Sequence, residues 1–150
     1  MILVSSCLGG INCKYSGENN INMFVLQLIN SGQAIPLCAE QLGGLPTPRI
    51  PAEIVGNRVI NKNGEDVTLE FEMGAKNVLA VCKALNIKVA ILKSKSPSCG
   101  CGKVYDGSFC GKLVDGNGIT AKLLSDNGIK VFSENQLDKF LDYKATESVG

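Results

Sequence analysis

The sequence contains no histidine and no tryptophan. Without histidine, the chain has no Ser-His or Cys-His catalytic pair and no imidazole ligand for a metal. Aromatic residues make up only 5% of its 150 residues, so the hydrophobic core must be built from aliphatic side chains. Thiol and carboxylate groups are therefore the main candidates for metal binding.

An excess of charge of one sign is also missing. Fifteen basic and fourteen acidic residues give a formal charge of +1, and no basic cluster predicts binding to duplex DNA. No apolar run approaches the roughly 20 residues that a membrane span needs. The first residues, MILVSSC, lack the basic start and the long apolar stretch of a signal peptide. We therefore expect a cytoplasmic protein that binds neither duplex DNA nor a membrane.

Cysteine, by contrast, is plentiful. The number of cysteines is odd and their density is below that of a disulfide scaffold, so metal binding or thiol chemistry is the stronger interpretation. The seven positions are Cys7, Cys13, Cys38, Cys82, Cys99, Cys101 and Cys110.

Short apolar runs alternate with segments of helical periodicity. The predicted strands are Ile2–Ser5, Ala34–Leu37, Val89–Leu92 and Ile129–Phe132, and the predicted helices are Asn22–Ile29, Thr68–Leu85, Ile119–Ser125 and Glu134–Tyr143. Glu53–Asn61, turning at Gly56-Asn57, and Gly102–Leu113 are expected to form hairpin inserts. This order predicts an α/β fold in one domain over residues 1–150. The expected architecture is a Rossmann-like three-layer sandwich, with a mainly parallel sheet and helices on both faces.

Two details complete the fold prediction. The inner face of the longest helix is expected to carry Leu69, Met73, Val78, Leu79 and Cys82, which makes Cys82 a core residue rather than a ligand. The last residues, Ala145–Gly150, are expected to form a frayed tail.

Three of the cysteines come shortly after predicted strands. Cys7 follows the first strand, Cys38 follows the second, and Cys99 lies in the loop after the third. In an open α/β sheet the carboxyl ends of parallel strands meet at one crevice, where ligands bind. We therefore expect the three thiols to share one site.

The chemistry of such a site favours an iron–sulfur cluster or another soft metal. Zinc fits less well, because a structural zinc site normally takes four ligands in closely spaced pairs and the gap between Cys99 and Cys101 is shorter than usual. A cubane cluster with three protein ligands leaves one iron open as a Lewis acid. Glu40, two residues after Cys38 and expected outside any helix, and Ser96 are candidates for proton transfer and substrate activation.

The loops that carry these cysteines resemble those of the TudS-type thiouracil desulfidase family. The matching runs are VSSCLGGINCKYSG (Val4–Gly17), PLCAEQLGGLPTPR (Pro36–Arg49) and LKSKSPSCG (Leu92–Gly100), and the similarity extends over nearly the whole chain. The resemblance implies a [4Fe-4S] cluster bound by Cys7, Cys38 and Cys99. It also implies removal of sulfur from a thiolated uracil as sulfide, with Glu40 and Ser96 as the catalytic pair.

The resemblance extends to neighbouring residues and to partners. Ser6, Arg49 and Ser98 are the substrate-binding candidates, whereas Cys13 and Cys101 are interpreted as bystanders or secondary thiols. The chain lacks the additional domain of longer relatives that act on thiolated transfer RNA, which favours a free thiolated base or nucleoside as substrate. A protein with such a cofactor would also receive it from the cluster-assembly machinery.

Two other functions remain as alternatives. The run from Cys7 to Lys14 resembles the phosphate loop of small tyrosine phosphatases and arsenate reductases, but that loop needs five residues between cysteine and arginine, and here six precede a lysine. A non-catalytic cluster carrier or redox sensor is the second alternative. It would have no need for Glu40 and Ser96 beside an open coordination position.

Overall fold

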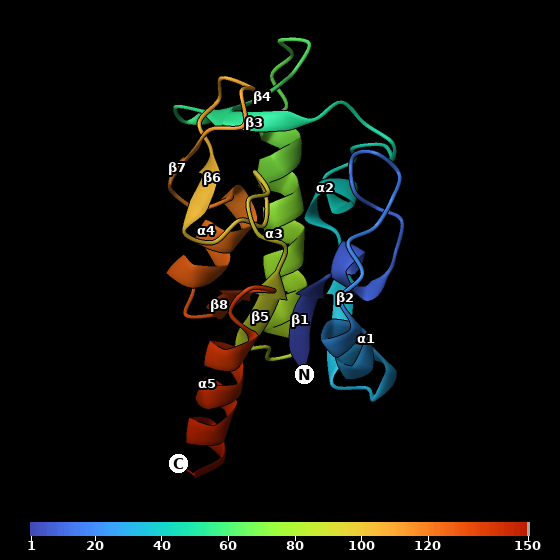
Figure 1. The fold of residues 1–150 in the computed structure, drawn as a ribbon, viewed down its shortest axis with the longest axis vertical. Coiled ribbons are helices and arrows are strands. Elements are labelled where there is room, and N and C mark those ends of the chain that lie inside the picture. Colours follow the sequence, from blue (N-terminus) through green and yellow to red (C-terminus); the bar gives the residue numbers. More distant parts are fainter. Residues whose placement is uncertain (150) are drawn as a thin grey trace.

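A parallel sheet forms the centre of the molecule (Figure 1). The computed structural model describes the backbone of residues 1–149 and the side chains of residues 1–147. Within this part, β1 (Ile2–Ser5), β2 (Ala34–Leu37), β5 (Val89–Leu92) and β8 (Lys130–Ser133) form a four-stranded sheet in the order β2-β1-β5-β8. All three neighbouring pairs are parallel. The strand predictions are confirmed, with β8 shifted by one residue.

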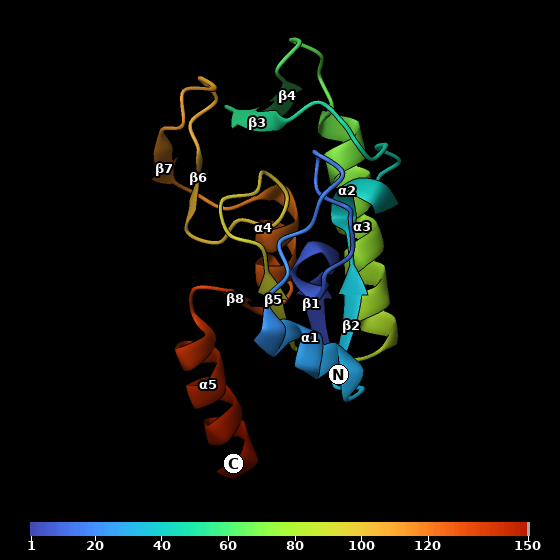
Figure 2. The same cartoon turned by 45° about the vertical axis from the view of Figure 1, so that its right-hand side comes forward.

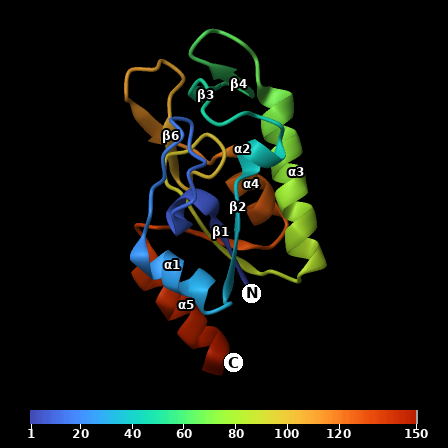
Figure 3. The same ribbon diagram turned by 90° about the vertical axis from the view of Figure 1, so that its right-hand side faces the viewer.

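Helices cover both faces of this sheet, as predicted. Figures 2 and 3 show α1 (Met23–Asn30) and α5 (Leu137–Val149) on one face, and α3 (Thr68–Ala84) and α4 (Ile119–Asp126) on the other. Successive strand residues point to opposite faces. Val4 therefore packs in the core with α1 and α5, whereas Leu3 packs in the core with α3 and α4. The three-layer α/β architecture is confirmed.

The face that α3 buries differs in part from the prediction. Its buried side chains include Phe71, Ala75, Val78 and Cys82, which recur every three or four residues. Leu69 and Met73 are 70% and 56% exposed, so their placement on the inner face was wrong. At 3.6 residues per turn the two lie on the side of the helix opposite Phe71 and Val78.

Two hairpins lie beyond the carboxyl ends of the sheet strands (Figure 1). The first pairs β3 (Ala52–Val55) with β4 (Arg58–Asn61) and turns at Gly56-Asn57, as predicted. The second pairs β6 (Lys103–Tyr105) with β7 (Leu113–Asp115), and residues 106–112 form a longer loop between them. Both inserts therefore stand over the edge where ligands bind in this class of fold.

Two further expectations were wrong. Glu40 does not lie outside a helix, because it belongs to the first turn of the short helix α2 (Ala39–Leu42). The chain end is not frayed from Ala145, because α5 continues to Val149; Gly150 lies outside the described residues. No helix in the described part of the chain has the length and apolar character needed to cross a membrane.

Candidate active site

A cavity of about 540 Å³ opens between the carboxyl ends of the strands and the two hairpins. The chain leaves β1 toward β2 on one side, and later returns to β5 on the other side of β1. This reversal is a topological switch point, at which the loops diverge and leave room for a ligand. The sheet topology thus produces the cavity.

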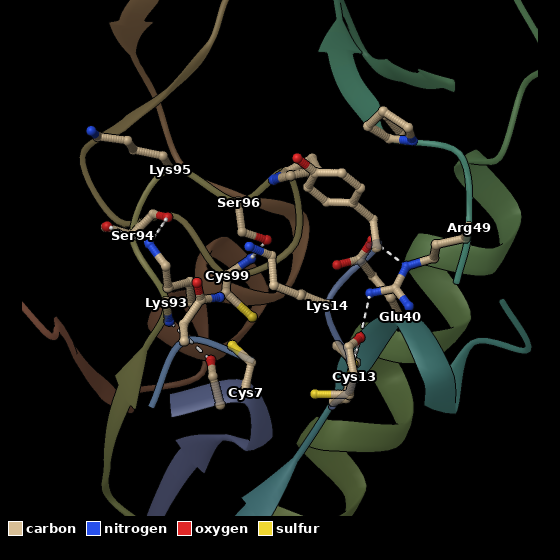
Figure 4. Close-up of a pocket in the computed structure, with 18 of the residues that line it drawn as sticks. Cys7, Cys13, Lys14, Glu40, Arg49, Lys93, Ser94, Lys95, Ser96 and Cys99 are labelled. Atoms are coloured by element: carbon tan, nitrogen blue, oxygen red, sulfur yellow. Dashed lines mark hydrogen bonds and ion pairs between the residues drawn. The ribbon is translucent and has the colours of Figure 1, made fainter. Parts of the chain in front are cut away.

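The structure brings the three strand-end cysteines together at this cavity. Cys7 lies on the 3-10 turn η1 (Ser6–Gly9), Cys38 precedes α2, and Cys99 lies in the loop after β5. All three line the cavity, and all are free thiols. Figure 4 shows the side chains of Cys7 and Cys99 directed toward each other.

Cys13 joins them, a placement that sequence analysis missed. This residue is 1% exposed and lines the same cavity. The thiol of Cys38 donates to the backbone oxygen of Cys13 at 3.8 Å. The available signal was its position in the same glycine-containing loop as Cys7, which folds back so that the N–H of Asn20 donates to the carbonyl of Cys7 at 2.9 Å.

This arrangement divides the thiols by acidity. Hydrogen bonding from Cys13 lowers the pKa of Cys7 to about 7 and that of Cys38 to about 6, although burial raises both. The same hydrogen bonds raise the pKa of Cys13 far above its ordinary value. Burial raises the pKa of Cys99 to about 12. These shifts favour the thiolate, the form that ligates metal, at Cys7 and Cys38, whereas burial disfavours it at Cys99.

The chemistry of the donor groups bears on the kind of metal centre that the cavity could hold. Among the described residues, no three cysteine or carboxylate side chains converge closely enough to hold a single metal ion. In an iron–sulfur cluster each cysteine binds its own iron, so the ligands lie around a larger body. Three free thiols at a cavity of about 540 Å³, in a chain without histidine, suit an iron–sulfur cluster, whose protein ligands are cysteine thiolates.

Glu40 lies at the cavity and is held by Arg49 (Figure 4). The Nε of Arg49 donates to Oε1 of Glu40 at 3.2 Å, and the two side chains are 5% and 19% exposed, respectively. Arg49 also donates to the backbone oxygen of Cys13 at 2.8 Å and to the hydroxyl of Thr47 at 3.0 Å. Arg49 thereby ties the loop after β1 to the loop after β2 and fixes the carboxylate of Glu40.

Packing between α2 and α3 also positions Glu40. A Cβ atom at Gly74 of α3 would overlap the backbone oxygen of Ala39, and one at Gly43 would overlap that of Glu70. Only glycine permits so close an approach of the two helix backbones. The position of α2 relative to α3, and with it the position of Glu40, depends on these two glycines.

Ser96 lines the cavity on the side opposite to Glu40 (Figure 4). Its hydroxyl oxygen accepts hydrogen bonds from the backbone N–H groups of Ser98 at 3.1 Å and Cys99 at 3.0 Å. Since both bonds use the oxygen as acceptor, the hydroxyl proton remains available as a donor. The same contacts fix the loop that carries Cys99.

The three substrate-binding candidates separate in the structure. Ser6 lines the cavity. Arg49 also lines it, but its donors are engaged by Glu40 and by backbone and hydroxyl oxygens. Ser98 does not reach the cavity, because its side chain is buried and its hydroxyl hydrogen-bonds with that of Thr120 at 2.8 Å. Substrate binding by Ser98 is therefore unsupported.

The cavity is richer in positive than in negative charge. Glu40 and Glu53 are its acidic lining residues. The basic lining residues are Lys14, Arg49, Lys62, Lys93 and Lys95. The Nζ of Lys93 forms an ion pair with Oε2 of Glu134 at 2.9 Å, and Glu134 itself is not a lining residue of this cavity. The excess of cations favours thiolates and other anionic groups in the cavity.

Known proteins are similar to this chain in sequence and in fold. The profile of the 2-thiouracil desulfurase family matches residues 2–136. The uncharacterized protein YbbK of Bacillus subtilis (strain 168) is 44% identical over 151 residues, which span 94% of this chain and 100% of YbbK. A solved structure of TudS, a [4Fe-4S]-dependent thiouracil desulfidase, superposes with a TM-score of 0.92 at 43% identity over 97% of both chains. With cysteines, carboxylate and serine gathered at the switch point of the same fold, the chain belongs to the 2-thiouracil desulfurase family.

Proposed function

We propose that the protein is a [4Fe-4S]-dependent desulfidase that converts a thiolated pyrimidine, such as 2-thiouracil, into the oxo base and sulfide. The observation that carries this proposal is the convergence of Cys7, Cys38 and Cys99 on one cavity that Glu40 and Ser96 also line. The printed activity and cofactor of the matching structure, at 43% identity over nearly the full chain, support it.

Cys7, Cys38 and Cys99 would hold the cluster. When bound, the cluster would supply an iron without a protein ligand, which polarises a carbon–sulfur bond as a Lewis acid. The net reaction takes one water and the thiolated base and yields the oxo base and hydrogen sulfide. No electron is gained or lost overall, so the protein has to supply only binding and proton transfer.

Glu40 is proposed as the proton acceptor. Arg49 binds Oε1, and no residue in the described part of the chain hydrogen-bonds to Oε2. Oε2 can therefore orient a water molecule at the thiocarbonyl carbon and take its proton. Ser96, with its oxygen already accepting two N–H bonds, can donate its proton to the base and so increase the electrophilicity of that carbon.

The proposed substrate class is a single base or nucleoside. A cavity of about 540 Å³ lies within the usual range for a small-molecule site. Tyr15 and Tyr105 line it together with polar groups, which suits a planar ring with amide-like edges. We further propose that the protein works in the cytoplasm, where its free thiols stay reduced and cluster-assembly proteins can load it.

The comparisons favour this function over both alternatives. A phosphate loop would have to encircle its ligand with N–H groups, whereas η1 and the folded-back segment after it place Cys13 beside Cys7 and Cys38. A protein that only carries a cluster does not require a carboxylate such as Glu40, fixed by the buried Arg49, in the cavity where a substrate would bind.

Anaerobic reconstitution with iron and sulfide tests the proposal. The wild-type protein should gain visible cluster absorbance and release sulfide from 2-thiouracil. Glu40→Gln should keep the absorbance and lose turnover, because the amide cannot accept the proton. Glu72→Gln, an exposed position on α3, is the matched control and should retain both. A protein that binds no cluster, or a Glu40→Gln variant with full turnover, would contradict the proposal.

A further inference from the structure

We propose that Phe109 is the aromatic wall against which the base packs, and that Glu53 is the positioning residue that holds it there. This inference rests on the proposed function, because it names the surface that selects a planar heteroaromatic ring. Neither residue belongs to the cysteine loops or to the catalytic pair.

Phe109 adopts a backbone conformation that a bulky residue rarely takes. It lies in the loop between β6 and β7 with a φ of 58°, in the left-handed region. Such a conformation is unfavourable for a residue with a large side chain and persists only where the surroundings enforce it. Phe109 is only half-buried, belongs to neither hydrophobic core, and lines the cavity. Core packing therefore does not account for its conformation.

Glu53 enforces that conformation from a different part of the chain. Its Oε1 accepts hydrogen bonds from the N–H of Gly107 at 3.0 Å and from the N–H of Phe109 at 3.1 Å. Glu53 lies on β3 and is 9% exposed. Among the described residues it takes part in no ion pair, so these two N–H groups are its stabilising partners. A buried carboxylate with only main-chain partners is a fixed anchor for the loop.

Other contacts also fix the loop between β6 and β7. Gly107 has a φ of 94°, and a Cβ atom there would lie 2.8 Å from the backbone oxygen of Ile54, so the loop rests directly on β3. Asp106 accepts from the N–H of Ser108 at 2.9 Å, and its own N–H donates to the carbonyl of Lys112 at 2.9 Å. The loop is thus closed at its base and anchored in its middle.

An aromatic ring fixed at the cavity has a direct use in this reaction. Pyrimidine rings stack on aromatic side chains, and such stacking is tolerant of substituents on the base. A rigid wall costs little conformational entropy when the ligand binds. Phe109 would therefore hold the ring plane while Glu40 and Ser96 act on its edge. The expected contribution is to binding and orientation rather than to proton transfer.

Substitution of Phe109 separates this role from a merely structural one. With cluster absorbance as the check on loading, Phe109→Ala should raise KM for 2-thiouracil at least tenfold and change kcat little. Phe109→Leu, which keeps bulk without an aromatic face, should lie between, and Phe109→Tyr should behave as wild type. Thioacetamide, a small thioamide without a ring, is the comparison substrate, and any turnover of it should be unaffected by these changes. A Phe109→Ala variant with wild-type KM would overturn the inference.

Glu53 is tested by a readout that does not depend on turnover. Glu53→Ala should speed hydrogen exchange at the amides of Gly107 and Phe109 and raise KM as Phe109→Ala does, whereas Glu53→Gln should do both more weakly. Calorimetric binding of uracil separates the two proposals. If the wild type binds uracil without desulfidase activity and Phe109→Ala binds it tenfold more weakly, the proposed function fails and the wall stands. If the wild type neither binds uracil nor releases sulfide from 2-thiouracil, both fail.

Discussion

Replacing Arg49 with methionine should destabilise the protein and disable Glu40 together. Arg49 is 5% exposed, and its guanidinium donates to Glu40, to the backbone oxygens of Cys13 and Pro46, and to Thr47. Methionine keeps much of the volume but none of the donors. Removing one partner of a buried ion pair costs about 3–5 kcal/mol. Because Glu40 is 19% exposed and can be partly hydrated, we expect the lower end, about 3 kcal/mol.

Both stability and kinetics should report this loss. For a chain of this size, 1 kcal/mol corresponds to about 2–4 °C in Tm, so thermal denaturation should show a decrease of about 6–12 °C. Misplacement of a reacting group by about 1 Å can cost about 10²-fold in rate, so kcat should fall by about that factor with a smaller change in KM. Arg49→Lys should recover part of the stability, and added guanidinium should recover part of the kcat of a cavity variant, Arg49→Ala.

The matched control is Arg58→Met. Arg58 pairs with Asp66 at 2.8 Å on the surface, where both side chains are more than two-fifths exposed. Solvent screening makes such a pair weak, so this variant should keep both Tm and kcat. If Arg49→Met matched Arg58→Met in both, the positioning argument would be refuted. A rise in KM alone would instead identify Arg49 as a substrate contact.

Three other outcomes are expected. Burial raises the pKa of Glu134, but Lys93 and the N–H of Ser94 outweigh it and lower the pKa overall. Glu134→Gln should therefore reduce the free energy of unfolding at pH values above the ordinary carboxyl pKa of about 4.3. The difference from wild type should vanish as the pH falls through the lowered pKa. Gly74→Ala should lower Tm and kcat together, because its Cβ would force α2 away from α3, an overpacking that costs about 1–3 kcal/mol. In the cluster-free protein, a disulfide reagent should modify exposed Cys110 rapidly and Cys82 only on unfolding, since burial raises the pKa of Cys82 to about 11.

Each of these outcomes has its own check. For Glu134→Gln, urea denaturation at several pH values measures the free energy of unfolding, and a difference from wild type that persists unchanged at pH 2 would contradict the prediction. For Gly74→Ala, the control is Met73→Ala at the neighbouring exposed position, which should leave Tm unchanged. For the thiols, mass spectrometry of labelled peptides gives the rate at each cysteine, and equal rates at Cys110 and Cys82 would refute the prediction.

Local patterns were sufficient to predict the elements of the fold and the shared cysteine site. The four sheet strands coincide with short apolar runs, with β8 shifted by one residue, and a cysteine follows three of them. The rule that parallel strands end at one crevice was therefore enough to group Cys7, Cys38 and Cys99. The face of α3 was less predictable. Leu69 and Met73 are four residues apart, but five residues separate Met73 from Val78, so at 3.6 residues per turn the two fall on the side of the helix opposite its buried face.

The sequence by itself determined the α/β order and the thiol-only donor set, because strand and helix periodicity and residue type are local properties. The tertiary structure alone decided that Cys13 lines the same cavity as Cys7 and Cys38, that Arg49 holds Glu40, and that Glu53 fixes Phe109 at the cavity. Each of these contacts joins segments far apart in the chain or depends on how a loop folds back. Hydrogen bonds of this kind depend on the distance and direction between two groups, and neither quantity exists until the chain has folded.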